Sequence, residues 1–156
     1  MNYSFIMLKP DALEGQLVET IMEYFSNANI EIERLGYKIV SEEILSKHYA
    51  EVIAKYGADF KRKLMNYFYQ KAVIPMIVRG ESTDLIADIR KIVGATEPIK
   101  ADKGTIRGDL SNDSFEKCAA EDRSCENLIH ASDSVENAKH EIEIWFGTEI
   151  ANRYFH

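Results

Sequence analysis

The order of apolar runs and helical patterns predicts an α+β fold, a ferredoxin-like split βαβ arrangement with a four-stranded antiparallel sheet covered by helices. Three observations predict this fold. Residues 3–9 and 72–79 are short apolar runs of strand length, and residues 30–40 alternate and are rich in β-formers. A brief strand ends near His130, directly before a helix start signal. A parallel α/β sheet remains compatible with the same pattern.

Proline and glycine residues mark the ends of the predicted helices and strands in the first half of the chain. Pro10 ends the first strand, and apolar residues at helical spacing follow it. Gly57 stops a later helix. The predicted elements are a strand over 3–9, a helix over 14–28, a strand over 30–40, and helices over 43–56 and about 59–70.

The second half begins with the strand over 72–79. Pro75 is awkward there, because proline lacks the amide donor that a strand ladder needs. Residues 95–112 form a long irregular stretch, which in a compact domain is commonly functional or mobile. The other predicted elements are a helix from Ser82 or Thr83 to Gly94, a short helix over 114–121, the strand ending near His130, and a helix with Val135, Ala138, Ile142 and Trp145 on one face.

Composition and charge limit the classes of protein to which this chain can belong. The 156 residues are enough for one domain with its own core, predicted over 1–156. A net charge of −7 and a pI near 5.1 argue against binding to a nucleic-acid backbone. The apolar run near the start is too short for a signal peptide or a membrane span. Cys118 and Cys125 fit neither a zinc pattern nor a disulfide framework, so two free thiols in a reducing cytoplasm are expected.

The segment over residues 127–133, Asn-Leu-Ile-His-Ala-Ser-Asp, carries the most functional information. His130 ends an apolar triplet, and Ser132 or Asp133 can cap the following helix, with Glu136 completing a capping box. A histidine there lies near a partly positive helix N-terminus, where phosphate binds well. Its neutral imidazole could take a phosphoryl group on one ring nitrogen. On these residues alone, a polar filler near a helix cap is the competing interpretation.

Phosphate binding would have to rely on side chains, because the chain has neither a P-loop nor a dinucleotide-binding glycine pattern. Three cations stand where chain reversals could aim them at one cleft. They are Lys9 at the end of the first strand, Arg90 near a helix C-terminus, and Arg107 in a glycine-flanked loop. The alternative is that each is a solvated surface charge. Arg90 could then simply interact favourably with the negative end of the helix dipole.

Four strings resemble motifs of the nucleoside diphosphate kinase family, in the same order along the chain. Besides residues 127–133, they are Lys-Pro-Asp at 9–11, Arg90 followed by Gly-Ala-Thr-Glu-Pro at 94–98, and Gly-Thr-Ile-Arg-Gly-Asp at 104–109. The resemblance runs from about residue 5 to residue 146. It implies an enzyme that transfers the γ-phosphoryl group of a nucleoside triphosphate to a nucleoside diphosphate by a ping-pong mechanism.

The resemblance also implies a role for each matching residue. His130 would be the residue that is phosphorylated, with Ser132 and Glu141 supporting it. Glu141 lies at the flank of the buried stripe of its helix, where a carboxylate needs a partner. Tyr49 would order the phosphorylated ring, although ordinary helix packing explains it equally well. The residues implied to hold the nucleotide are Lys9, Arg90, Thr96 and Arg107 on the phosphates, with Lys9 and Asn127 near the sugar hydroxyls.

Mg²⁺ is the implied cofactor. Because no Asp/Glu metal cluster is evident in the sequence, Mg²⁺ is expected to arrive on the nucleotide phosphates rather than to occupy a protein site. The implied partners are nucleoside di- and triphosphates and further copies of the chain, in a dimer-based tetramer or hexamer, with no nucleic acid and no membrane. Two rival functions are a catalytically silent nucleotide-binding domain of the same fold, and a protein-interaction or nucleic-acid-binding module.

The chain departs from the family pattern at two insertions, near 50–62 and over 110–126, where the base of the nucleotide would rest. The usual Pro-Phe-Phe is absent, and Phe60 is the expected substitute for the base-stacking phenylalanine. The three other histidines, His48, His140 and His156, match no motif and are expected to be exposed to solvent.

Overall fold

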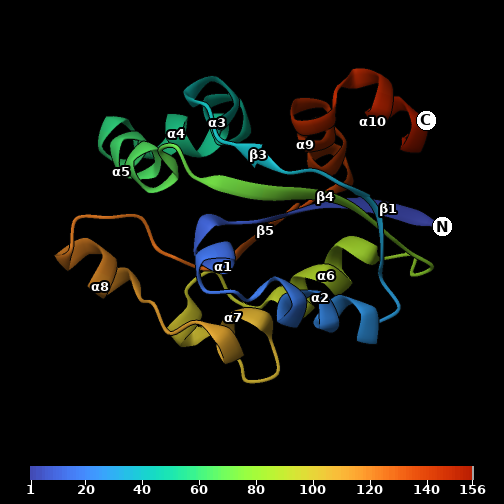
Figure 1. Ribbon diagram of the computed structural model, residues 1–156, viewed down its shortest axis with the longest axis horizontal. Coiled ribbons are helices and arrows are strands. Elements are labelled where there is room, and N and C mark those ends of the chain that lie inside the picture. Colours follow the sequence, from blue (N-terminus) through green and yellow to red (C-terminus); the bar gives the residue numbers. More distant parts are fainter. Residues whose placement is uncertain (156) are drawn as a thin grey trace.

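The computed structural model describes residues 1–155 and contains a five-stranded antiparallel sheet (Figure 1). The strand order is β2-β4-β1-β5, with β3 also paired to β4. The antiparallel α+β prediction is confirmed and the parallel alternative is wrong. The sheet has five strands rather than four because the predicted strand over 30–40 is divided in two. The strands are β1 (Asn2–Leu8), β2 (Glu31–Leu35), β3 (Lys38–Ile39), β4 (Ala72–Gly80) and β5 (Ile129–Ala131).

Pro75 explains the division between β2 and β3. Strand β2 pairs with β4 as far as Met76, and β3 resumes the pairing at Val73, so Pro75 faces the break. The amide of Gly36 donates to the carbonyl oxygen of Pro75 (2.9 Å). The proline therefore accepts a hydrogen bond where the ladder is interrupted, a position in which its missing N–H is tolerated.

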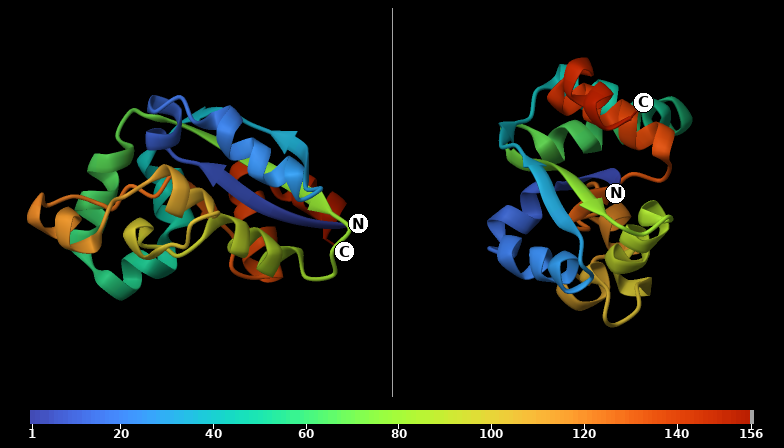
Figure 2. Two further views of the ribbon diagram at one scale, coloured as in Figure 1. Left: turned by 90° about the horizontal axis from the view of Figure 1, so that it is seen from below. Right: turned by 90° about the vertical axis from the view of Figure 1, so that its right-hand side faces the viewer.

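The helices form a layer on each face of the sheet (Figures 1 and 2). One face is covered by α3, α4, α5, α9 and α10, and the other by α1, α2, α6 and α7. The helices are α1 (Pro10–Glu14), α2 (Val18–Asn27), α3 (Glu42–His48), α4 (Ala50–Tyr56), α5 (Ala58–Phe68), α6 (Leu85–Val93), the 3₁₀ helix η1 (Pro98–Lys100), α7 (Ile106–Leu110), α8 (Phe115–Ala120), α9 (Val135–Phe146) and α10 (Thr148–Tyr154).

Strand alternation divides the apolar side chains between two cores. Because successive side chains of a strand point to opposite faces, Ile6 and Leu8 of β1 pack against α2 and α6. Phe5 and Met7 of the same strand pack on the other face, against α3, α5 and α9. The fully buried Trp145 of α9 anchors this second core. Strand β1 thus lies between two buried layers, which fixes the position of its C-terminal end.

Several predicted boundaries differ from the structure. The predicted helix over 14–28 begins only at Val18, as α2, and the short helix α1 before it was not predicted. Gln16, between the two helices, has a left-handed backbone conformation (φ +57°). The helix over 43–56 is interrupted at Tyr49, where α3 ends and α4 begins. The stretch over 95–112 is not irregular throughout, since η1 and α7 lie in it. Helix α10 has no counterpart in the prediction.

The sheet brings two candidate residues together from distant parts of the chain. Strands β1 and β5 are paired, with Met7 opposite His130. The amide of Lys9, just beyond β1, donates to the carbonyl oxygen of Leu128 (2.9 Å). Lys9 and His130 are therefore held near each other by the centre of the fold. Within residues 1–155, the helices are all too short or too polar to cross a membrane.

Candidate active site

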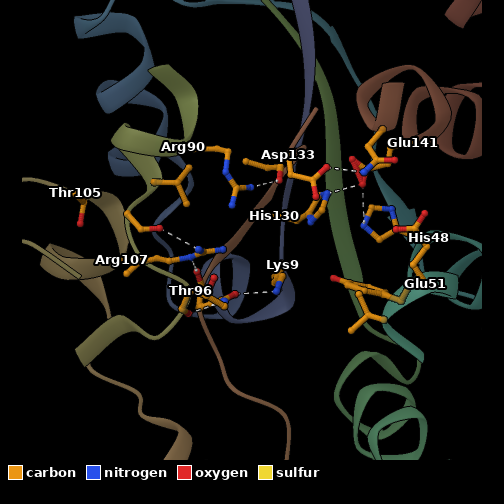
Figure 3. Close-up of a pocket in the computed structure, with 18 of the residues that line it drawn as sticks. Lys9, His48, Glu51, Arg90, Thr96, Thr105, Arg107, His130, Asp133 and Glu141 are labelled. Atoms are coloured by element: carbon orange, nitrogen blue, oxygen red, sulfur yellow. Dashed lines mark hydrogen bonds and ion pairs between the residues drawn. The ribbon is translucent and has the colours of Figure 1, made fainter. Parts of the chain in front are cut away.

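A pocket of about 830 Å³ opens between α3 and α4 on one side and α6, α7 and the loop between them on the other (Figure 3). Most of the candidate residues line it. Ser132 is buried behind the pocket wall, and Phe60 is not among the lining residues. The candidates that line it are Lys9, Tyr49, Arg90, Thr96, Arg107, Asn127, His130 and Glu141.

His130 is tied to the buried carboxylate of Glu141. Its Nε2 lies 2.7 Å from Oε2 of Glu141, and the hydroxyl of Ser132 donates to the other oxygen, Oε1. Burial, together with the charges of Lys9 and Arg107, lowers the pKa of His130 to about 3, so the ring is neutral. In the tautomer with the proton on Nε2, where the carboxylate of Glu141 accepts it, the other nitrogen, Nδ1, keeps its lone pair. A nucleophilic nitrogen is thereby fixed in the pocket wall.

The helix cap next to His130 differs from the prediction. Ser134, and neither Ser132 nor Asp133, caps α9, because its hydroxyl accepts from the amide of Asn137 (3.0 Å). Asp133 accepts from the side chain of Asn137 (2.5 Å). The predicted capping box with Glu136 is therefore wrong. This shift frees the Ser132 hydroxyl to turn inward, where it is 1% exposed and reaches Glu141.

Lys9 belongs to a chain of hydrogen bonds that joins three distant segments. Its ammonium group donates to Oδ1 of Asn127 (2.8 Å), whose amide nitrogen donates to the carbonyl oxygen of Thr96 (3.0 Å). Burial and the nearby Arg107 lower the pKa of Lys9 to about 8. Thr96 itself is exposed and lines the pocket. The three residues give the pocket one cation and two neutral polar groups.

Arg107 is buried but has no carboxylate partner among the described residues. Its guanidinium donates to the carbonyl oxygens of Asn127 (3.1 Å), Gly94 (3.2 Å) and Ile129 (2.6 Å). Burial and the nearby Arg90 lower the pKa of Arg107 to about 10, which still leaves it protonated near neutral pH. Carbonyl dipoles orient the group without cancelling its charge. The positive charge therefore remains available to an anion in the pocket.

Arg90 and a tight turn complete the cationic wall. Arg90, in the last turn of α6, donates to the carbonyl oxygen of Ala131 (3.4 Å). The turn before Arg107 is held by Thr105, whose hydroxyl donates to the carbonyl oxygen of Asp102 (2.6 Å). A Cβ on Gly108 would lie 2.0 Å from that same oxygen, so only glycine fits there. The turn is thus fixed by packing, and Arg107 with it.

Tyr49 stands at the junction between α3 and α4 and lines the same pocket. Its ring centroid lies 6.4 Å from that of His130. Its buried hydroxyl has no hydrogen-bond partner among the described residues, and burial raises its pKa, so it stays protonated. An unpaired buried hydroxyl is costly. It has the position and the free donor to bind an anion attached to His130.

His48 is the main residue that the sequence interpretation missed. The expectation that it is exposed is wrong, because its side chain is 1% exposed. Its Nδ1 accepts from the indole N–H of Trp145 (2.9 Å), and its ring centroid lies 4.5 Å from that of His130. The signal in the sequence was indirect: a buried tryptophan such as Trp145 usually needs a hydrogen-bond acceptor, but the sequence does not say which residue provides it. His140 is exposed as expected, and His156 lies outside the described residues.

Phe60 and the larger insertion lie away from the lining of this pocket. Phe60 is half-buried in α5, and its ring packs on Tyr56 with centroids 5.5 Å apart. The insertion over 110–126 contains α8 and is joined to α5 by Arg62, which donates to Asp122 (2.8 Å). The structure therefore brings together the residues that are expected to bind the phosphates and the sugar. Phe60, which is expected to stack on the base, is not among them.

Comparison with known proteins places this geometry in a family. A family model described as nucleoside diphosphate kinase matches residues 2–150. The chain belongs to the nucleoside diphosphate kinase family. The match covers β1 with the adjacent Lys9, β5 with His130, the cations Arg90 and Arg107, and the helix that carries Glu141.

Members of the nucleoside diphosphate kinase family resemble the chain along most of its length. A nucleoside diphosphate kinase of Methanothermobacter thermautotrophicus is 38% identical over 94% of this chain and 87% of the relative. Nucleoside diphosphate kinase B of Flaveria bidentis is 36% identical over 97% and 93%. A kinase of this family from Borrelia burgdorferi, solved as a transition-state mimic with vanadate and ADP, superposes with a TM-score of 0.86 at 31% identity, covering 93% and 86%.

Proposed function

We propose that this protein is a nucleoside diphosphate kinase, which transfers the γ-phosphoryl group of a nucleoside triphosphate to a nucleoside diphosphate through a phosphohistidine at His130. One observation carries the proposal. The neutral His130 is oriented by a buried carboxylate on one side, and on the other it faces cations that have no carboxylate partner among residues 1–155 (Figure 3). This arrangement suits a nucleophile that attacks an electron-rich phosphate.

The transfer proceeds in two balanced halves. The Nδ1 lone pair of His130 forms a bond to the γ-phosphorus, while the bond from that phosphorus to the β–γ bridging oxygen breaks and the diphosphate leaves with the electron pair. The ring of His130 gains positive charge, which the ionised carboxylate of Glu141 stabilises through the Nε2–H. A terminal oxygen of a second nucleoside diphosphate then attacks the phosphohistidine, and Nδ1 recovers its lone pair.

The other pocket residues bind and orient the nucleotide in this proposal. Lys9, Arg90 and Arg107 neutralise charge on the phosphates, and the hydroxyl of Thr96 donates to a phosphate oxygen. Asn127 and Lys9 hold the sugar hydroxyls. The free hydroxyl of Tyr49 donates to the phosphoryl group on His130. Ser132 acts indirectly, because it holds Glu141 in place.

Mg²⁺ is proposed to come with the substrate, as a complex of the nucleotide phosphates. Among residues 1–155, the cluster of possible metal ligands in the pocket lining consists of His48, His130 and Glu141, with only one carboxylate. Two imidazoles with one carboxylate suit softer metals better than Mg²⁺. The protein's own residues therefore bind the phosphates rather than the ion.

We also propose a single domain over 1–156 that assembles into a dimer-based tetramer or hexamer in the cytoplasm. Both cores flank the same sheet, which supports one domain. Strand β2 is an edge strand. The segment from β2 to β3 exposes Ile32, Leu35, Tyr37 and Ile39, which supports association with another copy. Cys118 and Cys125 are free thiols, which supports a reducing compartment.

Labelling with γ-labelled ATP tests the proposal. The unmodified protein should acquire a phosphate that is labile in acid and stable in base, and should pass it to a nucleoside diphosphate. His130→Ala should lose both reactions while nucleotide binding largely survives, and Lys139→Ala, away from the pocket, should behave like the parent. A protein that binds nucleotide without taking up label would instead be the catalytically silent domain.

A further inference from the structure

His48 is a buried histidine that the proposed reaction does not yet use. Its Nδ1 accepts the indole N–H of Trp145 (2.9 Å). An accepting nitrogen carries no proton, so in the neutral ring the proton is on Nε2. Burial and the neighbouring His130 hold the pKa of His48 well below its usual value, so the neutral form persists near neutral pH. The tryptophan thereby fixes one tautomer, with an N–H donor at Nε2.

That donor is unsatisfied and directed at the site. Nε2 of His48 has no hydrogen-bond partner among the described residues, although the side chain is 1% exposed. Oε2 of Glu141 lies 3.7 Å from it. This is the same oxygen that lies 2.7 Å from Nε2 of His130. The two histidines therefore approach one carboxylate oxygen, and one of them stops just beyond hydrogen-bonding distance.

A metal site is the competing use of this cluster, since nitrogens of His48 and His130 and an oxygen of Glu141 lie within 4.8 Å of one another. A metal needs the lone pair of Nε2 on His48. The proton would then have to move to Nδ1, where it would meet the N–H of Trp145 head-on. A metal-bound histidine normally donates its second N–H to an acceptor instead. The bond from Trp145 therefore favours a donor and not a ligand.

We propose that His48 is a positioning residue whose Nε2–H closes onto Oε2 of Glu141 when His130 is phosphorylated. The inference rests on the proposed function. Burial raises the pKa of Glu141, which works against the ionised carboxylate that a positively charged phosphohistidine ring requires. A second N–H on Oε2, added to the Ser132 hydroxyl on Oε1, favours the ionised form and prevents the carboxylate from rotating. Catalytic hydrogen bonds that are long in the free enzyme commonly shorten as the reaction proceeds.

A matched pair of variants tests this role. His48→Gln keeps an N–H near the position of Nε2, whereas His48→Asn keeps only an acceptor near the position of Nδ1. Losing one hydrogen bond to a charged group should slow phosphoenzyme formation in His48→Asn by about ten- to hundredfold. Nucleotide affinity should stay within about twofold, because His48 is proposed to act on Glu141 and not on the phosphates. His48→Gln should recover most of the rate.

Nitrogen NMR on the unmodified protein gives a readout that a merely structural role would not move. His48 should show an unprotonated Nδ1 and a protonated Nε2, and the Nε2–H proton should shift downfield when ATP phosphorylates His130. The opposite tautomer, an unchanged Nε2–H signal, or equal rates for the Asn and Gln variants would overturn the role of His48. If the unmodified protein takes up no label from ATP, the proposed function fails instead, which keeps the two failures distinct.

Discussion

The guanidinium of Arg107 faces three backbone carbonyl oxygens, whereas that of Arg123 faces the carboxylate of Asp113 at 2.7 and 2.9 Å. The carboxylate of Asp113 also accepts from the amides of Ser114 and Glu126. Arg123 therefore closes the insertion over 110–126 with its charge neutralised. Arg107 is oriented just as firmly, but its charge stays unpaired. The difference separates a cation that binds a ligand from one that holds a loop.

The largest effect should come from Arg107→Ala. Removing a charge-assisted contact at a reacting phosphoryl group should cost about 2–4 kcal/mol of transition-state stabilisation, measured as kcat/KM. Arg123→Ala should change kcat/KM much less, because its charge is already neutralised by Asp113. Similar losses of kcat/KM in the two variants would break the comparison.

Asp113→Ala should affect folding rather than catalysis. The carboxylate is 5% exposed and satisfies five donors, so its loss should lower the free energy of unfolding by about 2–3 kcal/mol in urea denaturation. Glu116→Ala, on the exposed surface of α8, is the matched control and should change the free energy of unfolding little.

The hydrogen bonds that Asp113 accepts, above all from Arg123, hold the pKa of Asp113 far below its usual value. Its contribution to stability is therefore complete above about pH 4 and is lost as the pH falls below that.

The pH dependence of kcat/KM should depend on Lys9, another cation of the pocket. The pKa of Lys9 is about 8, so kcat/KM for nucleotides should fall as the pH rises through that value and phosphate loses a cation. Stability should respond in the opposite sense. Because the pKa is lowered from about 10.4 in the unfolded chain, the folded protein binds fewer protons between about pH 8 and 10.4, and this group favours folding as the pH rises. A flat activity profile up to pH 10 would contradict the role of Lys9.

The smallest effect should come from Asp122→Asn. Asp122 joins the insertion to Arg62 and Lys63 of α5, but its side chain is 67% exposed. Exposed ion pairs contribute at most about 1 kcal/mol and are screened by salt. The variant should therefore melt within a few degrees of the parent, with the difference vanishing in high salt. A large, salt-independent loss would mean that the insertion depends on α5 as well as on Asp113.

Sequence reasoning succeeded where a local pattern determines the position of a residue. The apolar run of β1 and the brief strand near His130 were both predicted from local pattern. Their pairing in the structure brings Lys9 and His130 together. Glu141 was identifiable because a carboxylate beside a buried stripe needs partners, and it has Ser132 and His130. Family strings located Arg90, Thr96 and Arg107, whose roles in binding stay predictions.

The failures share the opposite cause, since they depend on contacts between distant segments. His48 lies in a polar helix and gives no local signal; Trp145, far along the chain, decides its burial. Phe60 was placed from the family pattern, but it does not line the pocket, which is lined there by the start of α4. Its role in stacking on the base stays a prediction. Pro75 looked misplaced because the break between β2 and β3 is visible only once the sheet is assembled.

The unpaired charge of Arg107 favours binding of an anionic ligand, and ligand binding stabilises the folded protein by mass action. A ligand that binds only the folded state adds about 2.7 kcal/mol of stability when its concentration is a hundred times the dissociation constant. With a nucleotide as the proposed ligand, a larger nucleotide pool should lower the small fraction of this chain that is unfolded and open to proteases. The amount of enzyme should then follow the size of the metabolite pool without any change in synthesis.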